Sequence, residues 1–423
     1  MVFHVRDSLA VVSVSELERW SACITGSDTV RYSLEQGDFH FFEKLQLLPD
    51  IENRRNLLGH GSYGSVYQGL DPISGEPIAI KTVSTANVWE EASFLKKCAG
   101  HRNFIKLRGT LAGALPGSSC LLLEYAHWDL RDFARHTTSS TLRMRFICRE
   151  LLRGAAFMHA RGIIHRDIKP DNILVRVEQG SKYLRVCYSD FGLSWQCAPG
   201  SSSSFITTDT PELITTLNYR APELLCELPV YDRSIDIWSL GVTLAEVALE
   251  GRLLFTGKHP EEILACVIQE IGPLPKLLAD TQCGIKAMCL VNTNGTKYVP
   301  LRNRLPDTPA SAKFIDFIHK LLKYEATERC TARKAMSHAW VSSASVQREQ
   351  TWNAPLPLLL FASAHETYRR AHELYTRKCD RTFEEVFEHV QCNRAKVGLV
   401  MYDNCEHSEL KAAFFAAINA RIS

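Results

Sequence analysis

The stretch I163-I-H-R-D-I-K-P-D-N-I-L-V175 joins two apolar runs through a dense group of ionisable and polar residues. The runs at 163–164 and 173–175 have the composition of buried strands. Unpaired charges beside buried segments cost free energy, so a chain that needed only a core would not place them here. The pattern predicts a site for chemistry formed by this group, which comprises His165, Arg166, Asp167, Lys169, Asp171 and Asn172.

Bulk composition excludes several classes of function. The chain has 423 residues, 45% of them hydrophobic and 23% charged, with a formal net charge of +2. This balance gives no electrostatic reason to expect nucleic acid or a membrane surface as a partner. The most apolar late run, at 355–364, is too short to span a bilayer and contains prolines. We therefore expect a soluble protein without nucleic-acid or membrane partners.

Cysteine usage points to a reducing compartment. The fourteen cysteines are scattered through the chain, with no C-x-x-C pair and no Cys/His cluster at zinc spacing. The first twenty residues lack a clear cleavage site and make a poor signal peptide. The sequence predicts reduced thiols in an intracellular protein of the cytoplasm, the nucleus or both.

The order of expected elements divides the chain into two lobes. Residues 51–125 contain short strands around one helix: a glycine-rich pair of strands, a β-branched strand at 76–83, a helix at 87–99 and an apolar strand at 119–126. From about 129 to 341 helices dominate, for example at 141–162, where Gly162 is a C-terminal stop. A small β-rich lobe and a larger helical lobe predict a cleft between them for a small molecule.

Two extensions flank this pair of lobes. Residues 1–50 form an N-terminal extension that ends near Pro49. Residues 342–423 contain amphipathic segments and are predicted to form a helical C-terminal extension. Neither extension carries a motif that assigns a role.

A glycine loop lies near the start of the small lobe. Gly59, Gly61 and Gly64 precede Val66 between two strands. A dinucleotide fold needs a helix after its glycines, so this loop does not fit that fold. A strand–glycine–strand hairpin can lie over a triphosphate, because glycines without Cβ atoms let backbone N–H groups approach the phosphates.

Four further motifs follow in a fixed order, and together with the glycine loop they carry a family resemblance. They are Ala79-Ile80-Lys81, the quoted His165-Arg166-Asp167-x-Lys169-x-x-Asn172, Asp190-Phe191-Gly192 and Ala221-Pro222-Glu223. The chain resembles a eukaryotic protein kinase over about residues 52–341. The resemblance implies an α+β, bilobal protein kinase fold, with an N-lobe at 51–125 and a C-lobe at 126–341.

The resemblance also implies roles for single residues, with ATP and Mg²⁺ as the nucleotide and the metal. Asp167 would accept the proton of the substrate hydroxyl, Lys169 would face the transferred phosphate, and Asn172 and Asp190 would hold Mg²⁺. Lys81 would hold phosphates and be held in turn by Glu91. The remaining nucleotide-binding residues would be Leu58, Gly59, Gly61, Gly64, Val66, Ala79, Glu124, Tyr125, Ala126 and Leu174, with Leu123 as gatekeeper.

Several segments narrow the resemblance to the branch of cyclin-dependent and mitogen-activated kinases. The segments at 59–69, 215–225 and 231–247 are similar to that branch, and the stretch from 263 to about 312 is similar to its insert. In the closing segment at 321–340, Arg329 would pair with Glu223. Lys169 implies a Ser/Thr kinase of protein substrates, and Tyr219-Arg220 favours sites that are followed by proline.

Some positions depart from the pattern of this branch. Glu91 follows Lys81 after only ten residues, a shorter interval than the family generally has, and Asn218 replaces a tryptophan. Glu90 and Trp195 stand where relatives carry arginines, which leaves Arg166 alone of the three that bind a phosphate on the activation segment. A regulatory role therefore cannot be assumed for phosphorylation of Thr207, Thr208 or Thr210, and the resemblance to kinases that bind a cyclin-like regulatory subunit is weakened.

Two other functions remain open on the sequence. A pseudokinase scaffold would bind partners through the kinase fold and the C-terminal extension, but such proteins usually lack the lysine, the catalytic aspartate or the metal aspartate. A small-molecule kinase would share the fold, but the branch segments quoted above form a platform for protein substrates.

Overall fold

The computed structural model describes residues 57–61, 64–70, 77–84, 86–115, 118–137, 140–177, 184–197, 204–206, 215–293 and 298–342. The predicted extensions lie outside these ranges, apart from Ser342, and so do Thr207, Thr208 and Thr210. Among the helices of the described part, none has the length and hydropathy that a bilayer crossing needs.

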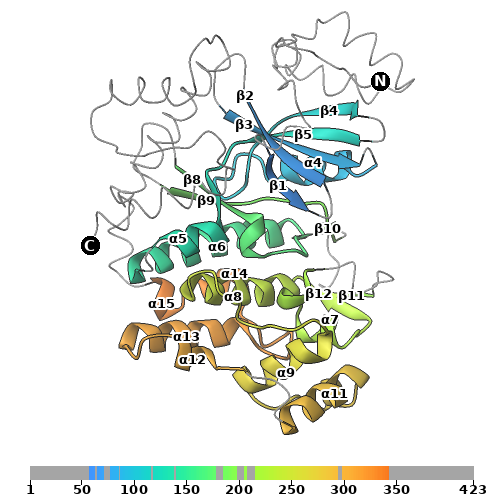
Figure 1. Ribbon diagram of the computed structural model, residues 1–423. Coiled ribbons are helices and arrows are strands. Elements are labelled where there is room, and N and C mark those ends of the chain that lie inside the picture. Colours follow the sequence, from blue (N-terminus) through green and yellow to red (C-terminus); the bar gives the residue numbers. More distant parts are fainter. Residues whose placement is uncertain are drawn as a thin grey trace, which may run out of the picture.

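The small lobe is built on a five-stranded antiparallel sheet (Figure 1). Its strands run in the order β1-β2-β3-β5-β4. They span Leu57–Gly61, Gly64–Leu70, Pro77–Ser84, Ser118–Glu124 and Leu107–Leu115 in that order. The expected glycine hairpin is β1–β2, and the expected strands at 76–83 and 119–126 are β3 and β5. β4 had no specific prediction.

The glycine hairpin lies close against β3. Gly64 has φ +141°, and a Cβ atom there would lie 1.8 Å from the carbonyl oxygen of Thr82. The Thr82 hydroxyl also accepts a hydrogen bond from the Ser65 N–H at 3.0 Å. Only glycine fits this close approach, which fixes the end of the hairpin over the cleft.

One helix, α4 (Val88–Lys97), covers the sheet on one side (Figure 1). Its apolar positions Val88, Ala92 and Leu95 are buried, as their helical spacing predicts. Glu91 lies on the same buried side, whereas Glu90 is exposed. The helix therefore turns one carboxylate toward the interior.

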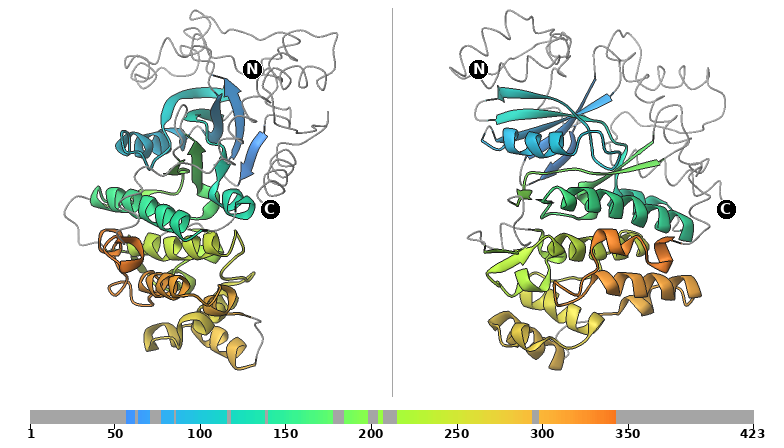
Figure 2. Two further views of the ribbon diagram at one scale, coloured as in Figure 1. Left: turned by 90° about the vertical axis from the view of Figure 1, so that its left-hand side faces the viewer. Right: turned by 180° about the vertical axis from the view of Figure 1, so that it is seen from behind.

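Helices form most of the large lobe, and Figure 2 shows them gathered at the opposite end from the sheet. α6 (Thr141–Ala160) begins after the Ser140 side chain, which accepts from the Arg143 N–H, and ends before Gly162, whose φ is +71°. α8 (Ser234–Ala248) is buried over nearly its whole length and forms the centre of the lobe. The remaining helices of four or more residues are α5 (Leu130–His136), α7 (Pro222–Leu225), α9 (Pro260–Ile271), α10 (Lys276–Ala279), α11 (Gln282–Asn292), α12 (Leu301–Arg304), α13 (Pro309–Leu321), α14 (Ala332–Ala335) and α15 (Ala339–Ser342).

Short strands lie between the two lobes. β6 (Trp128–Asp129), β8 (Ile173–Val177) and β9 (Leu184–Tyr188) form a three-stranded sheet. The 3-10 turn η3 (Pro170–Asn172) precedes β8. A smaller pair follows, β7 (Ile163–Ile164) with β10 (Trp195–Gln196). Another pair, β11 (Ser204–Ile206) with β12 (Val230–Asp232), lies beside α7 in the large lobe (Figure 1). The quoted stretch thus runs from β7 through η3 into β8, and it lies at the boundary between the lobes.

Candidate active site

The loop after β7 is anchored by a buried carboxylate in the first turn of α8. Asp236 accepts the backbone N–H groups of His165 and Arg166, each at 2.9 Å, and contacts the His159 ring at 2.9 Å. These bonds stabilise Arg166 at φ +66°, a conformation that non-glycine residues rarely adopt. Burial would raise the pKa of Asp236, but His159 and the bound N–H groups outweigh it and hold this pKa below its ordinary value.

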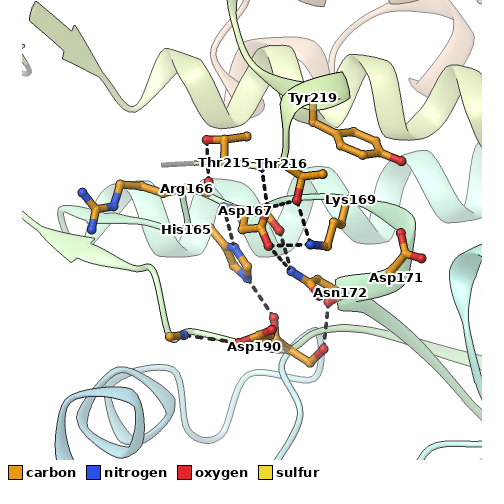
Figure 3. Close-up of polar contacts among 12 residues, drawn as sticks. His165, Arg166, Asp167, Lys169, Asp171, Asn172, Asp190, Thr215, Thr216 and Tyr219 are labelled. Atoms are coloured by element: carbon orange, nitrogen blue, oxygen red, sulfur yellow. Dashed lines mark hydrogen bonds and ion pairs between the residues drawn. The ribbon is translucent and has the colours of Figure 1, made fainter. Parts of the chain in front are cut away.

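The Asp167 carboxylate is the centre of a polar cluster (Figure 3). One oxygen accepts from the Lys169 ammonium and the Asn172 amide, both at 2.8 Å. The other accepts from the backbone N–H and the hydroxyl of Thr216, at 3.0 and 2.8 Å. Lys169 also donates to the Thr216 hydroxyl at 2.8 Å. Three residues of the quoted stretch thus converge with one residue from 49 positions later in the chain.

A second charged group joins the two lobes. The Lys81 ammonium lies 2.7 Å from Glu91 Oε1 and 2.7 Å from Asp190 Oδ1. Burial alone would lower the pKa of Lys81, but the two carboxylates outweigh it and raise its pKa above the ordinary value. Lys81 in turn holds the pKa of Asp190 below its ordinary value against the effect of burial. The structure places Glu91, not Glu90, against the lysine despite the short interval between them.

A cavity of about 640 Å³ connects these groups. Its lining includes most of the predicted residues: Leu58, Gly59, Gly64, Val66, Ala79, Lys81, Leu123, Glu124, Tyr125, Ala126, Lys169, Asn172, Leu174 and Asp190. Two predicted residues of the described part lie outside the lining: Glu91 and Asp167. Glu91 and Asp167 still contact lining residues, Lys81 and Lys169 respectively.

Two neighbouring threonines belong to the site although the sequence analysis assigned them no role. Thr216 contacts Asp167 and Lys169, as described above. Thr215 has φ +66°, donates its hydroxyl to the Arg166 carbonyl at 2.6 Å, and accepts at its own carbonyl from Arg220 Nε at 2.9 Å. The sequence feature that could have indicated them is the Thr-Thr pair before Leu217, in the segment at 215–225 that is similar to the branch.

An arginine from α5 forms a second network at the front of the cavity. Arg131 donates to both Asp171 oxygens, at 3.0 and 2.9 Å, and to Glu246 at 3.3 Å. Tyr219 donates its hydroxyl to the same Glu246 carboxylate at 2.7 Å and also contacts Arg131. Despite partial burial, Arg131 holds the pKa of Asp171 below its ordinary value. Asp171 is therefore the ion-pair partner of Arg131.

Arg166 points away from the Asp167 cluster in Figure 3. Its guanidinium donates to the Tyr231 hydroxyl at 3.0 Å and to the Leu193 carbonyl, and it lies over the Trp195 ring with 5.4 Å to the ring centre. Trp195 is one of the positions where relatives carry an arginine. The one remaining arginine of that set is thus held by partners within the chain.

The fold and the site define a class of protein. A glycine hairpin and a buried lysine face amide and carboxylate oxygens across a cavity, and a second carboxylate lies on the adjoining loop. Enzymes that move a phosphoryl group from a nucleotide work chiefly by such positioning and charge neutralisation.

Comparison with known proteins identifies the family. The profile of the protein kinase domain matches residues 53–341, more than half of the chain. The chain is 31% identical over 309 residues to "Cell division control protein 2 homolog 3" of Trypanosoma brucei brucei, which covers 70% of this chain and 93% of the relative. It therefore belongs to the protein kinase family.

Other relatives come from both groups of the branch. "Cyclin-dependent kinase 20" of Homo sapiens is 27% identical over 339 residues, covering 78% of this chain and 93% of the relative. "Extracellular signal-regulated kinase 2" of Dictyostelium discoideum is 27% identical over 319 residues, covering 73% and 82%. The protein is an ATP-dependent Ser/Thr protein kinase of the cyclin-dependent and mitogen-activated branch, which confirms the predicted fold class and activity. The pseudokinase alternative is not favoured.

Proposed function

We propose that this kinase phosphorylates serine or threonine in protein segments where proline follows the acceptor, and that the residues assigned from the sequence carry the reaction. The observation that carries the catalytic part is the convergence of Lys81–Glu91–Asp190 and Asp167–Lys169–Asn172 at one cavity. Asp167 orients the hydroxyl of the substrate and takes its proton, while Lys169 neutralises negative charge on the phosphoryl group during transfer.

The oxygen donors of the site fit Mg²⁺. The Asn172 amide nitrogen donates to Asp167, so the Asn172 amide oxygen faces away from Asp167. In the described part of the chain, Asp190 contacts Lys81 through Oδ1, and no contact with Lys81 uses its Oδ2. Over the described ranges, no group of three or more His, Cys, Asp or Glu residues forms a metal cage. Mg²⁺ commonly takes one or two protein oxygens and completes its shell with phosphates and water. We assign Asn172 and Asp190 as its protein ligands, and the ion would supply charge neutralisation at the phosphates.

Selection of proline follows from the backbone beside Asp167. The Thr215 carbonyl is already engaged by Arg220, and the left-handed conformation of Thr215 turns its backbone. The substrate residue that follows the phosphorylated serine or threonine would bury its N–H against this backbone without a hydrogen-bond acceptor. Such a buried, unsatisfied N–H costs about 1–3 kcal/mol. Proline has no N–H group and avoids that cost. This argument supports preference for Ser-Pro and Thr-Pro sites.

A peptide assay tests both parts of the proposal. The full chain is given radiolabelled ATP, magnesium and two peptides that differ only in Pro or Ala after the serine. We expect incorporation with the Pro peptide, at least about ten-fold less with the Ala peptide, and none above background with Asp167→Asn. Equal rates with both peptides would refute proline selection alone. Incorporation that survives Asp167→Asn would refute the catalytic assignment.

A cyclin-like regulatory subunit has less support. In protein kinases the pair of the lysine and the helix glutamate must be in place for activity, and the position of the helix controls it. Here Lys81 and Glu91 already form that pair within the single chain. We therefore propose protein substrates as partners and leave a cyclin-like subunit as the weaker proposal.

A further inference from the structure

Glu124 lies at the end of β5, where the chain passes from the small lobe to the large one. Its carboxylate is 97% buried and lies between two arginines. Arg176 Nε is 3.3 Å from Oε1, and Arg185 Nη2 contacts Oε2. The backbone N–H of Lys106 donates to the same carboxylate at 3.3 Å. Although Glu124 lines the nucleotide cavity, its charge is thus engaged by arginines.

The next residue of the connection is held as well. Arg176 donates Nη1 to the Tyr125 carbonyl at 2.7 Å. Glu124 donates its own N–H to the Lys106 carbonyl at 2.9 Å. The Glu124 carboxylate and the Tyr125 carbonyl are therefore both bound by charged guanidinium groups, and hydrogen bonds of this kind are stronger than neutral ones.

Both arginines lie on strands that are adjacent in sequence to the proposed metal ligands. Arg176 lies on β8, which follows Asn172 directly, and Arg185 lies on β9, which leads to Asp190. The two arginines are direct neighbours across the β8–β9 ladder. Like charges in that position destabilise a sheet, and Glu124 offsets their repulsion.

The cluster is poorly explained as a device for stability. Desolvation of buried ions consumes most of their Coulombic gain, and apolar residues of similar volume often stabilise a fold better. What such a cluster does supply is fixed geometry, because a guanidinium holds a carboxylate in one orientation. The cluster links two parts of the nucleotide site: the connection at 124–126, and the residues Asn172 and Asp190.

We propose that Arg176 and Arg185 are positioning residues for nucleotide binding. Through Glu124 and Tyr125 they set the backbone that faces the base at a fixed distance from the residues that hold the metal and phosphates. The proposal deepens the function proposed above and rests on its nucleotide site. A shift of about 1 Å in such a frame is enough to weaken a productive complex strongly.

The test uses the full chain with Arg185→Met and Arg176→Met, which remove one charge each and keep a long apolar side chain. We expect the KM for ATP to rise about ten-fold, while the KM for the Pro peptide stays within about two-fold. Arg185→Lys keeps the charge without the planar fork and should give an intermediate KM for ATP. Phe317→Leu, a change in the buried core of α13, is the control for lost stability.

Calorimetric titration with Mg–ADP separates this proposal from the proposed function. If the wild type binds Mg–ADP and the methionine variants bind it about ten-fold more weakly, the positioning role stands even if no peptide is phosphorylated. If the methionine variants lose only thermal stability, as Phe317→Leu does, and keep the nucleotide affinity of the wild type, the positioning role is refuted. A wild type that takes up no nucleotide would overturn both proposals.

Discussion

At the scale of single residues, the Asp167 carboxylate depends on a side chain that is remote in sequence. Lys169 and Asn172 bind one of its oxygens, but the other is held by Thr216 alone among the described contacts. Without the Thr216 hydroxyl, one oxygen would keep only a backbone N–H, and the carboxylate could rotate. A general base that is misoriented loses part of its effect of about 10²–10⁴-fold on the rate.

Thr216→Val should therefore lower kcat by about 10–100-fold and leave the KM for ATP within about two-fold. Thr216→Ser, which keeps the hydroxyl, is the matched control and should retain most of the rate. Steady-state kinetics with the Pro peptide measure both parameters. A serine variant as slow as the valine variant would show that the methyl group, and not the hydrogen bond, matters.

Local motifs and long-range contacts were not equally predictable. Asp167, Lys169 and Asn172 could be found because one short stretch contains them and matches the catalytic loop of the protein kinases. Thr216 could not be placed beside Asp167, because their contact depends on a chain path of 49 residues that composition does not encode. Arg176 and Arg185 are a similar case, because the sequence shows them only as strand residues and does not pair them with Glu124. Contacts outside the family motifs were missed for this reason, whereas the Arg329–Glu223 pair was predicted from the resemblance.

At the scale of elements, the first turn of α8 anchors the loop after β7 through Asp236. Because the folded-state pKa of Asp236 is lowered, its charge stabilises the fold fully above the unfolded pKa of about 3.9 and loses this effect as the pH falls through the lower folded value. Asp236→Asn should lower the free energy of unfolding by about 1.5–3 kcal/mol at pH 7, with the gap closing below about pH 4. Urea unfolding of both proteins at pH 7, 5 and 3.5 measures this. A gap that is the same at all three values would contradict the assignment.

The activation segment, which contains Thr207, Thr208 and Thr210, leads to a prediction about phosphorylation. In relatives three arginines would bind a phosphate on it, but here Glu90 and Trp195 replace two of them, and Arg166 is held by Tyr231, Leu193 and the Trp195 ring. A phosphate would have to displace these partners and would gain a single guanidinium. Phosphatase treatment, checked by intact mass, should therefore change kcat by less than about two-fold, as should Thr207→Ala, Thr208→Ala and Thr210→Ala combined. Loss of activity by ten-fold or more would show that a phosphate is required.

At the scale of the whole molecule, the two lobes and their order were predictable because the periodicity of apolar residues changes near residue 126. The buried face of α4 and the end of α6 at Gly162 agree with the pattern. The strand β4 was not singled out, because its sequence L107-R-G-T-L-A-G-A-L115 contains two glycines and little alternation. Its pairing with β5, which is itself buried, holds it in the sheet despite a weak intrinsic preference.

In the large lobe, a buried ion pair joins two residues that are 106 positions apart in the sequence. Arg329 donates to both oxygens of Glu223, at 2.7 and 2.6 Å, and its side chain is fully buried. The pair joins the segment after the active site to the last helices, as the resemblance implied. Removing one partner leaves a buried charge without its counterion, which is costly although the intact pair contributes little net stability.

Arg329→Gln should therefore lower the free energy of unfolding by about 3–5 kcal/mol. Lys320→Gln, which breaks the exposed pair with Asp316 on α13, is the control and should cost less than about 1 kcal/mol. Urea unfolding, followed by tryptophan fluorescence, gives both values. Because Glu223 lies in α7, which follows the Thr215–Thr216 backbone within a few residues, the Arg329 variant should also lose selectivity for proline in mild urea before it unfolds. If Arg329→Gln and Lys320→Gln lower the free energy of unfolding and the selectivity for proline equally, the Arg329–Glu223 pair has no larger effect than a surface ion pair. In that case it does not support the substrate site.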